Sequence, residues 1–202
     1  SFVKGKSSGA TGYAVDAGAN SSTIKLSQTS GVFSVGEQLI VNGIDLSGKG
    51  GATWIKNREQ NDNNWLFATS LGAGTGMRTN STGEAWGFGN PGMTSFNSNG
   101  FTVGTHDGVN GTDENLVSWS WRNAAGFFDT IAYEGTGSTQ QISHSLGCVP
   151  GCIMIKETSG TEGWRVYHTS KGNSYALELH HTTGGYSYNG WNNTTPTSTE
   201  FS

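Results

Sequence analysis

Alternation of apolar and polar residues is clearest in the middle of the chain. This period of two predicts a β-strand with one buried face. A break around Gly126 follows the strand, and a second aromatic-rich run begins at Phe127. The break therefore predicts a junction between two β modules. The alternating residues of the tryptophan-rich strand are Val117, Ser118, Trp119, Ser120, Trp121 and Arg122.

Short apolar runs separated by glycine, serine and asparagine fill the rest of the chain, and none has the helical period with caps. We therefore predict an all-β chain of three parts: a small N-terminal β module (1–48), a first β-sandwich repeat (49–125) and a second, incomplete one (126–202). The predicted strands are 12–15, 23–28, 37–41, 52–56, 65–68, 77–79, 100–104, 117–122, 127–133, 139–144, 152–156, 165–168 and 176–180.

The second and third parts resemble each other at a constant shift of 100 residues, without gaps. Glycine and serine matches carry little weight in so glycine-rich a chain, but several apolar matches fall on predicted strands. The informative pairs are Ile55 with Ile155, Lys56 with Lys156, Phe67 with Tyr167, Met77 with Leu177, and Phe101 with Phe201.

The second copy ends at Ser202, before the partner of the tryptophan-rich strand is reached. A sandwich without its last strand exposes an unpaired edge and an apolar face. Either the chain is a truncation of a longer protein, which we favour, or a neighbour's strand completes it. The missing initiator methionine also favours a piece of a longer protein.

Composition excludes several classes of function. Glycine accounts for 32 of 202 residues and charged residues for 13%, with a net charge of −4 and a pI near 5.7. The scattered cationic residues form no basic stripe, which argues against nucleic acid as a partner. No apolar run approaches the ~20 residues of a membrane span, so we expect no membrane insertion. Two cysteines are too few for a disulfide scaffold.

Several motifs occur in the order found in a tandem β-sandwich domain of marine bacteriophage virion proteins, which the chain resembles over about 50–202. The resemblance implies a concanavalin-like jelly roll, of a kind common in tail fibre and other appendage proteins. Two weaker motifs, SGATGY at 8–13 and FSVGE at 33–37, resemble small β repeats of phage virion proteins. Cys148 and Cys152 depart from the apolar residues expected there. The stronger motifs are WIKNR (54–58), TSFNSNGFTVG (94–104), VSWSW (117–121), FFD (127–129), ISHSLGCVPG (142–151) and WRVYH (164–168).

Candidate metal ligands are few. Cys148 and Cys152, with His144 nearby, lack the spacing of a zinc site, and we interpret them as two small buried side chains flanking a Pro-Gly turn. Whether the two cysteines are bonded to each other stays open. His180 and His181 end a predicted strand, so their side chains should point to opposite faces.

An acidic, glycine-rich loop carries oxygen ligands of the kind that calcium prefers, although the EF-hand spacing is absent. Asx and glycine residues also dominate plain hairpin loops, which is the interpretation we favour. We therefore predict no cofactor, with calcium as the alternative. The candidate calcium ligands are Asp107, Asn110 and Asp113.

Catalytic groups are not evident. A glycosidase on this fold needs two facing carboxylates, whereas Asp129 and Glu134 would point to opposite faces of a continuous strand. The one Gly-x-Ser-x-Gly match, at 5–9, lacks the strand and helix of a nucleophile elbow. We therefore predict no enzymatic activity.

Exposed aromatics interleaved with amides would suit glycan binding, since ring faces stack on sugars and amides bond their hydroxyl groups. Packing against the sandwich or a neighbouring subunit is the interpretation we favour. Trp86 and Phe88 occupy equivalent places in the first copy. The glycan-binding candidates are Tyr186, Tyr188, Trp191 and Asn192.

We therefore expect a viral structural protein of the virion surface: a segment of a bacteriophage tail fibre or appendage. Its partners would be copies of itself, other virion proteins and host-surface polysaccharide. A lectin-like carbohydrate-binding module predicts a monomer with glycan affinity. A capsid decoration protein predicts a compact oligomer on a shell.

Overall fold

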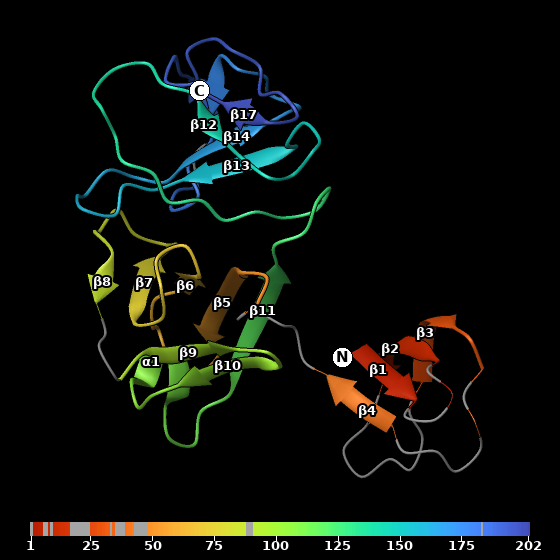
Figure 1. Cartoon of the computed structure of the whole chain (residues 1–202). Coiled ribbons are helices and arrows are strands. Elements are labelled where there is room, and N and C mark those ends of the chain that lie inside the picture. The colour runs from red at the N-terminus through yellow and green to blue at the C-terminus, as the bar shows by residue number, and fades with distance from the viewer. Residues whose placement is uncertain are drawn as a thin grey trace.

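Antiparallel β-strands make up nearly all the regular structure of the chain (Figure 1). The computed structural model describes residues 2–5, 8, 10–16, 25–32, 34, 39–42, 48–87, 91–182 and 184–202. Within these ranges the single helix, α1 (Asp107–Asn110), is one turn, and no helix there has the length and apolar character to cross a membrane. The prediction of a chain built almost entirely of β structure is confirmed.

The N-terminal module is a four-stranded antiparallel sheet in the order β3-β2-β1-β4. Three of these strands overlap predicted ones, while β1 was not predicted because only Phe2 and Val3 are apolar among the first six residues. Positions 23–24 and 37–38 of the predicted strands lie outside the described residues. The strands are β1 (Phe2–Gly5), β2 (Thr11–Asp16), β3 (Lys25–Ser30) and β4 (Leu39–Asn42).

The first half, which we define as residues 49–125, contains a five-stranded sheet in the order β11-β5-β6-β7-β8. A hairpin of β9 (Met93–Asn97) and β10 (Gly100–Val103) and the turn of α1 accompany it (Figure 1). The strands of the sheet are β5 (Gly51–Asn57), β6 (Trp65–Ala68), β7 (Thr75–Arg78), β8 (Trp86–Gly87) and β11 (Leu116–Arg122).

The core of the first half lies between the sheet, the hairpin and α1. Large side chains from β5 and β6 meet others from the hairpin and the helix, and removing this much apolar surface from water supplies the main stabilisation of the half. Partly buried residues of β9, β10 and β11 surround the cluster. The buried members are Ile55, Trp65, Phe67, Met93 and Val109.

The tryptophan-rich strand is confirmed as β11, but its tryptophans do not join this core. Ser120 lies on the core face, where its hydroxyl is 3.0 Å from that of fully buried Thr53. Trp119 is 50% exposed, and Trp121 lies on the same outer face. The ring centroid of Trp119 is 6.5 Å from that of Trp54, and the ring centroid of Trp121 is 6.4 Å from it. Alternation defines two faces of a strand and leaves open which one is covered; here Ser120 lies against the core while Ser118 on the same face is exposed, and the tryptophans pack on the outer face.

The second half, residues 126–202, contains three two-stranded antiparallel sheets. Its core comprises Tyr167, Ala176 and Trp191, with Ile153 and Ile155 packed against them. The pairs are β12 (Ile142–Ser143) with β17 (Glu200–Phe201), β13 (Cys152–Ile155) with β14 (Arg165–His168), and β15 (Tyr175–Ala176) with β16 (Tyr186–Ser187).

Strand register recurs between the halves at the shift of 100 residues. Thr53 pairs with Phe67 and Ile153 with Tyr167; likewise Gly76 pairs with Trp86 and Ala176 with Tyr186. The Leu66–Met77 pair of β6 and β7 recurs as an isolated bridge between Val166 and Leu177. The repeat seen in the sequence is therefore also present in the backbone pairing of the strands.

Three predicted strands of the second half are wrong or too long. Residues 127–133 form a turn closed by a bridge between Ala124 and Phe128, followed by irregular chain. Of 139–144 only Ile142 and Ser143 are paired, and of 176–180 only Ala176 and the bridging Leu177. Glycine and polar residues on both sides give these short runs too few cross-strand partners to extend a ladder.

Besides the hydrogen bonds at the junction itself, where Ala124 bonds Phe127 and Phe128 and Asn123 bonds Thr130, two hydrogen bonds between distant positions join the halves in the described chain. The indole Nε1 of buried Trp164 donates to the Arg78 carbonyl oxygen at 2.9 Å, and the Ala85 amide donates to the Thr158 carbonyl oxygen at 2.9 Å. Trp164 lies in the loop before β14, and Arg78 ends β7. An indole that fills space in one half and bonds the backbone of the other should couple their unfolding.

We expect Trp164→Phe to lower the free energy of unfolding by about 1–2 kcal/mol and to separate the unfolding of the two halves, because the aromatic ring stays while the N–H donor is lost. Urea unfolding followed by fluorescence and circular dichroism measures both effects. Trp191→Phe is the matched control, since Trp191 Nε1 donates to the Tyr175 carbonyl oxygen within the second half. A single, unshifted transition for Trp164→Phe would contradict the coupling.

Candidate functional site

The candidate site lies where β15 and β16 meet the loop before Trp191. Pairing of Tyr175 with Ser187 places both side chains on one face of the two-stranded sheet. The Tyr188 amide donates to the Ser174 carbonyl oxygen at 2.9 Å, which continues the pairing by one residue. The Asn173 side chain then fixes the following turn by donating to the Asn193 carbonyl oxygen at 2.9 Å.

Together these residues line a shallow depression of about 390 Å³ in the surface. Tyr175 is 42% exposed, and hydroxyl and amide groups surround it. A tyrosine ring beside several neutral hydrogen-bonding groups is the chemistry that carbohydrate recognition uses. The lining residues are Ser174, Tyr175, Ser187, Tyr188, Asn189 and Asn193.

The four predicted glycan residues divide between this depression and its support. Tyr188 lines the depression, whereas Trp191 is 4% exposed and packs against Tyr167 and Tyr188, with ring centroids 5.9 and 5.6 Å away. Trp191 is therefore wrong as a glycan-binding candidate, and the favoured interpretation, packing against the sandwich, holds for it because the ring belongs to the core. Asn192 is exposed, but Asn193 rather than Asn192 lines the depression.

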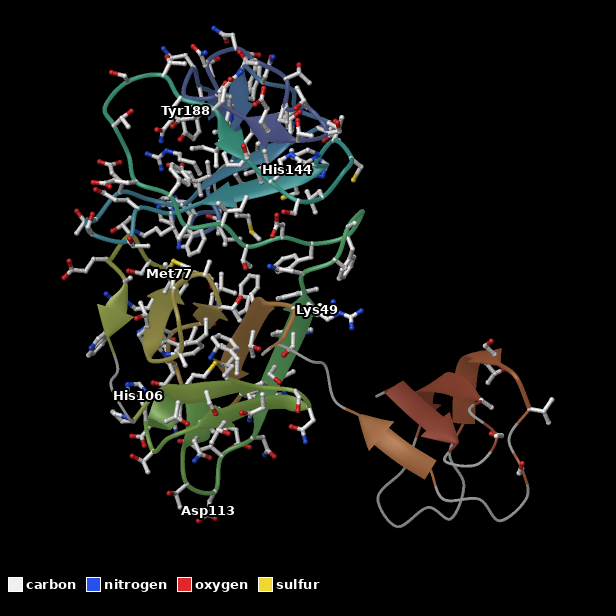
Figure 2. The ribbon with its side chains drawn as sticks, in the orientation of Figure 1. Lys49, Met77, His106, Asp113, His144 and Tyr188 are labelled. Atoms are coloured by element: carbon white, nitrogen blue, oxygen red, sulfur yellow. The ribbon has the colours of Figure 1, made fainter. Side chains whose placement is uncertain are left out.

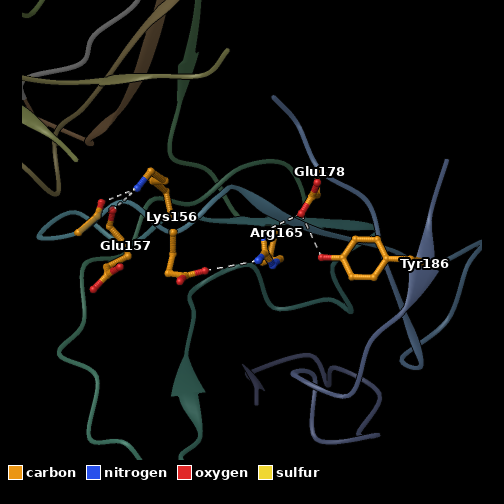
Figure 3. Close-up of polar contacts among 7 residues, drawn as sticks. Lys156, Glu157, Arg165, Glu178 and Tyr186 are labelled. Carbon is orange, nitrogen blue, oxygen red and sulfur yellow. Dashed lines mark hydrogen bonds and ion pairs between the residues drawn. The ribbon is translucent and has the colours of Figure 1, made fainter. Parts of the chain in front are cut away.

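Tyr186 is held in a polar cluster behind the depression (Figure 3). Glu178 Oε1 accepts hydrogen bonds from Arg165 Nη1 at 2.9 Å and from the Tyr186 hydroxyl at 3.3 Å. Burial raises the pKa of Tyr186, and the neighbouring Glu178 carboxylate raises it further against the opposing effect of Arg165. Tyr186 is thus a supporting residue, and Arg165 extends the support to Tyr188, whose ring centroid is 5.9 Å from Arg165 Cζ.

Sequence reasoning missed Tyr175, Asn189 and Asn193. The signal was present in the repeat, because Tyr175 is the counterpart of Thr75 at the start of a strand. An aromatic residue that replaces threonine at a strand end has no core function to serve. Asn189 and Asn193 gave no distinguishing signal among so many asparagines.

The equivalent region of the first half contains a cation among aromatic rings. Arg78, the counterpart of Glu178, places Cζ 6.0 Å from the ring centroid of Trp65 and 5.6 Å from that of Trp86. His106 meets both indoles edge to face, with centroids 5.9 and 6.3 Å apart. Phe88, the other aromatic predicted here, lies outside the described residues.

The calcium candidates are not brought together. Asp107 faces a second shallow depression with Asp62 and Glu114, whereas the Asn110 side chain donates to the Gly104 carbonyl oxygen at 2.8 Å. Asp113 is exposed in a turn at the end of the molecule opposite to Tyr188 (Figure 2). Among the described residues, no group of three or more acidic, histidine or cysteine side chains could hold a metal ion.

The acidic depression has a structural explanation. Fully buried Asn57 donates to Asp62 Oδ2 at 3.1 Å and to Glu114, and its Oδ1 accepts the amides of Glu59 and Gln60 at 3.0 and 3.1 Å. The carboxylates therefore satisfy a buried amide that would otherwise be costly to desolvate. Their arrangement holds the loop after β5.

Among the described residues of the second half, the cysteine and histidine side chains do not come together as a metal site either. Cys148 and Cys152 are both free and exposed, so the prediction that they are buried is wrong. His144 Nδ1 accepts the Leu146 amide at 3.3 Å. His180 and His181 lie in a turn with their rings edge to face at 5.4 Å, so the prediction of opposite faces is wrong. The turn replaces the expected strand end.

The carboxylates considered for catalysis lie in irregular chain. Asp129 accepts the Ser145 amide at 2.7 Å and the Thr130 amide at 2.9 Å, which anchors the junction between the halves. Glu134 is exposed, and its carbonyl oxygen accepts the Gln140 side chain at 3.0 Å. The strand assumed in the sequence argument does not form there, so alternation does not describe how these two residues are arranged.

A family model described as a domain of unknown function, DUF7483, matches residues 29–202, and the chain belongs to that family. No curated protein and no solved structure matches the chain.

The reactivity of Cys152 tests how far the structure shields its sulfur from water. Burial raises the pKa of its thiol although the residue as a whole is exposed, because neighbouring groups shield the sulfur from part of the water. Since the thiolate is the reactive form, we expect alkylation of Cys152 to rise at a higher pH in the folded chain than in urea. Mass spectrometry of the alkylated peptide between pH 7 and 10 measures this, and an equal or lower midpoint in the folded chain would contradict it.

Proposed function

We propose that this chain is a structural segment of a bacteriophage virion, in a tail fibre or another surface appendage, which assembles with copies of itself and other virion proteins. It would contact host-surface polysaccharide through the depression at Tyr175 and Tyr188. The two halves would be tandem jelly-roll sandwiches of the concanavalin-like type. The virion motifs described above and the recurrent strand register support this architecture.

The assembly part of the proposal rests on apolar surface that the described β structure leaves exposed to solvent. Trp119 and Phe127 are 50% and 65% exposed at the two ends of a row of aromatic rings beside the outer face of the five-stranded sheet. Neighbouring centroids in this row lie 5.9 to 6.5 Å apart, and the rings between the two ends are Trp54, Trp121 and Phe128. Monomeric proteins rarely leave several large aromatic side chains together in water, and such patches mark interaction surfaces. An assembly would cover this outer face.

The glycan part rests on the chemistry of the depression. Its neutral amides and hydroxyls suit sugar hydroxyl groups, and the exposed Tyr175 ring suits the apolar face of a pyranose. This observation also favours the second candidate, a free-standing lectin-like module. The two candidates differ in whether the chain associates with itself.

We expect residues 1–202 to form a specific oligomer of defined mass in solution. Native mass spectrometry and light scattering over a range of concentrations measure this. Trp119→Ser and Phe127→Ser together should shift the chain toward monomer, because they remove the most exposed rings of the outer face. A monomer at every concentration would contradict self-assembly and favour the lectin-like module; a compact shell-binding oligomer would instead indicate a capsid decoration protein.

We expect Tyr175→Ala to weaken binding to a glycan found by array screening at least tenfold, which corresponds to about 1.4 kcal/mol. The lost ring removes the stacking surface while the polar lining stays. Trp86→Ala is the control, because Trp86 is 48% exposed in the first half and belongs neither to the depression nor to the row of rings proposed for assembly. Equal losses for both variants, or no loss for Tyr175→Ala, would contradict a site in the depression.

A further inference from the structure

The depression at Tyr175 has an internal control, because each position that lines it has a counterpart in the first half at the shift of 100 residues. Asn193 stands where the first half has Met93, a fully buried core residue. At three other lining positions the second half has a polar side chain where the first half has only glycine. The replaced glycines are Gly74, Gly87 and Gly89, and the polar residues are Ser174, Ser187 and Asn189. The polar lining is therefore a property of the second half and not of the repeated strands.

The surface at this place is open even in the half that contains β11. A Cβ at Gly87, the counterpart of Ser187, would meet no described residue other than its chain neighbours within 4 Å. The first half has its five-stranded sheet, its hairpin and α1, and none of them covers this point. The open surface at Ser187 is therefore not explained by a strand that the second half lacks.

The loop after β16 is held in one conformation by contacts that leave two of its side-chain amides unused. Asn192 and Asn193 have φ angles of 50° and 47°, in the left-handed region that asparagine adopts more readily than most residues. The Asn192 amide donates to the Asn189 carbonyl oxygen at 2.9 Å. The Asn173 side chain donates to the Asn193 carbonyl oxygen at 2.9 Å and to the Thr195 hydroxyl at 3.2 Å. These bonds fix the backbone from which the Asn189 and Asn193 side chains project.

The polar side chains of the lining are available to a ligand. The side-chain amides of Asn189 and Asn193 form no hydrogen bond with another described residue, and neither do the hydroxyl groups of Ser174 and Ser187. Amides and hydroxyls each supply both a donor and an acceptor, as a sugar hydroxyl group does. A neutral sugar can therefore replace the water at this surface with hydrogen bonds of the same kind.

Among the described residues, those that line the depression carry no charge at neutral pH. Arg165 lies against the Tyr188 ring, but its charge is compensated. Its guanidinium bonds Glu178 at 2.9 Å (Figure 3) and Glu162 at 3.5 Å. Lys171 is exposed in the turn after β14 and lies outside the lining. The second half carries six aspartate and glutamate residues against three lysine and arginine residues, so the surrounding field also disfavours anions.

We propose that the depression is selective for uncharged sugars: it takes a neutral pyranose residue of a polysaccharide and discriminates against sugars that carry a carboxylate, sulfate or phosphate group. A neutral sugar stacks its apolar face on Tyr175 and exchanges hydrogen bonds with the amides of Asn189 and Asn193. An anionic sugar gives up water around its charge when it enters, and no cation in the lining replaces that hydration. The inference rests on the glycan role proposed above and names the class of sugar that the depression takes.

The probes are pairs of oligosaccharides that differ only at C6, with a hydroxymethyl group in the neutral member and a carboxylate in the uronic acid member. Pairs of the gluco, galacto and manno series are titrated into the full chain by calorimetry at ~0.15 M salt. In any pair that binds, we expect the neutral member to bind roughly tenfold or more tightly than its uronate partner. Tyr175→Ala should weaken the binding, because it removes the stacking surface.

Asn189→Lys tests the physical reason for the selectivity, because it places a cation in the lining. We expect the uronate member to gain roughly tenfold relative to its neutral partner in this variant. Asn99→Lys is the matched control, since it adds the same charge in the exposed turn between β9 and β10 of the first half and should leave the preference unchanged. Near-ultraviolet circular dichroism checks that both variants are folded.

Failure of this inference and failure of the proposed function give different results. Equal or tighter binding of the uronate member, weakened by Tyr175→Ala, would overturn the selectivity and leave the glycan role standing. Binding that Lys171→Ala removes and Tyr175→Ala leaves unchanged would move the sugar out of the depression and overturn the inference as well. An equal gain for the uronate in Asn99→Lys and Asn189→Lys would assign the preference to net charge and not to the lining, against the inference. Absence of binding in all three pairs would overturn the glycan role itself.

Discussion

Antiparallel pairing of two consecutive strands, β5 with β6 and again β13 with β14, is the constraint on which the rest of the structure depends. The register sets Thr53 opposite Phe67 and Ile153 opposite Tyr167, which places one large ring from the second strand of each pair in each core. A slip of one residue would turn each ring outward, because side chains alternate between faces. The pairing therefore fixes the face of each strand pair on which its core forms, and Met93, Val109 and Trp191 from other segments complete the two cores.

Outside these paired strands, the two halves carry residues of opposite charge at one equivalent position, Arg78 in the first half and Glu178 in the second. Arg78 lies over two indole rings, whereas its counterpart Glu178 accepts hydrogen bonds from Arg165 and Tyr186. Both solutions avoid an unpartnered charge beside aromatic rings, the first through a cation–π contact and the second through opposite charge. The arrangement around Glu178 leaves the surface lined by Tyr175 and Tyr188 exposed, since the supporting charges of Glu178 and Arg165 lie behind the rings.

Sequence patterns predicted the strands that contribute to the cores and failed where the chain depends on distant partners. Strands 65–68 and 165–168 match β6 and β14 because their aromatic residues alternate with smaller ones between clear turns. The run at 127–133 failed because apolar content alone does not provide a cross-strand neighbour, and Phe128 instead closes a turn. Sequence alternation also left open which face of β11 is covered, since that depends on what packs there.

The candidate site, too, was predicted only in part from the sequence. Tyr188 was found from its place in an aromatic, amide-rich loop, and Trp191 was misplaced because such a loop can bury one ring to present another. The anchor of Trp191 is its hydrogen bond to the Tyr175 carbonyl oxygen at 2.8 Å, a contact between residues sixteen positions apart that no local pattern encodes. The buried indole thus holds the backbone from which the exposed Tyr175 ring projects.

Both cores form away from one edge of the repeated strand pair. In the first half β11 covers the outer edge of β5, yet the core residues Trp65 and Phe67 lie on β6, away from that edge. Tyr167 and Trp191 likewise form the second core away from the outer edge of β13. Pairing at this edge therefore contributes backbone hydrogen bonds and surface coverage more than core burial, so each core depends chiefly on the strand pair and on the segments that pack against it.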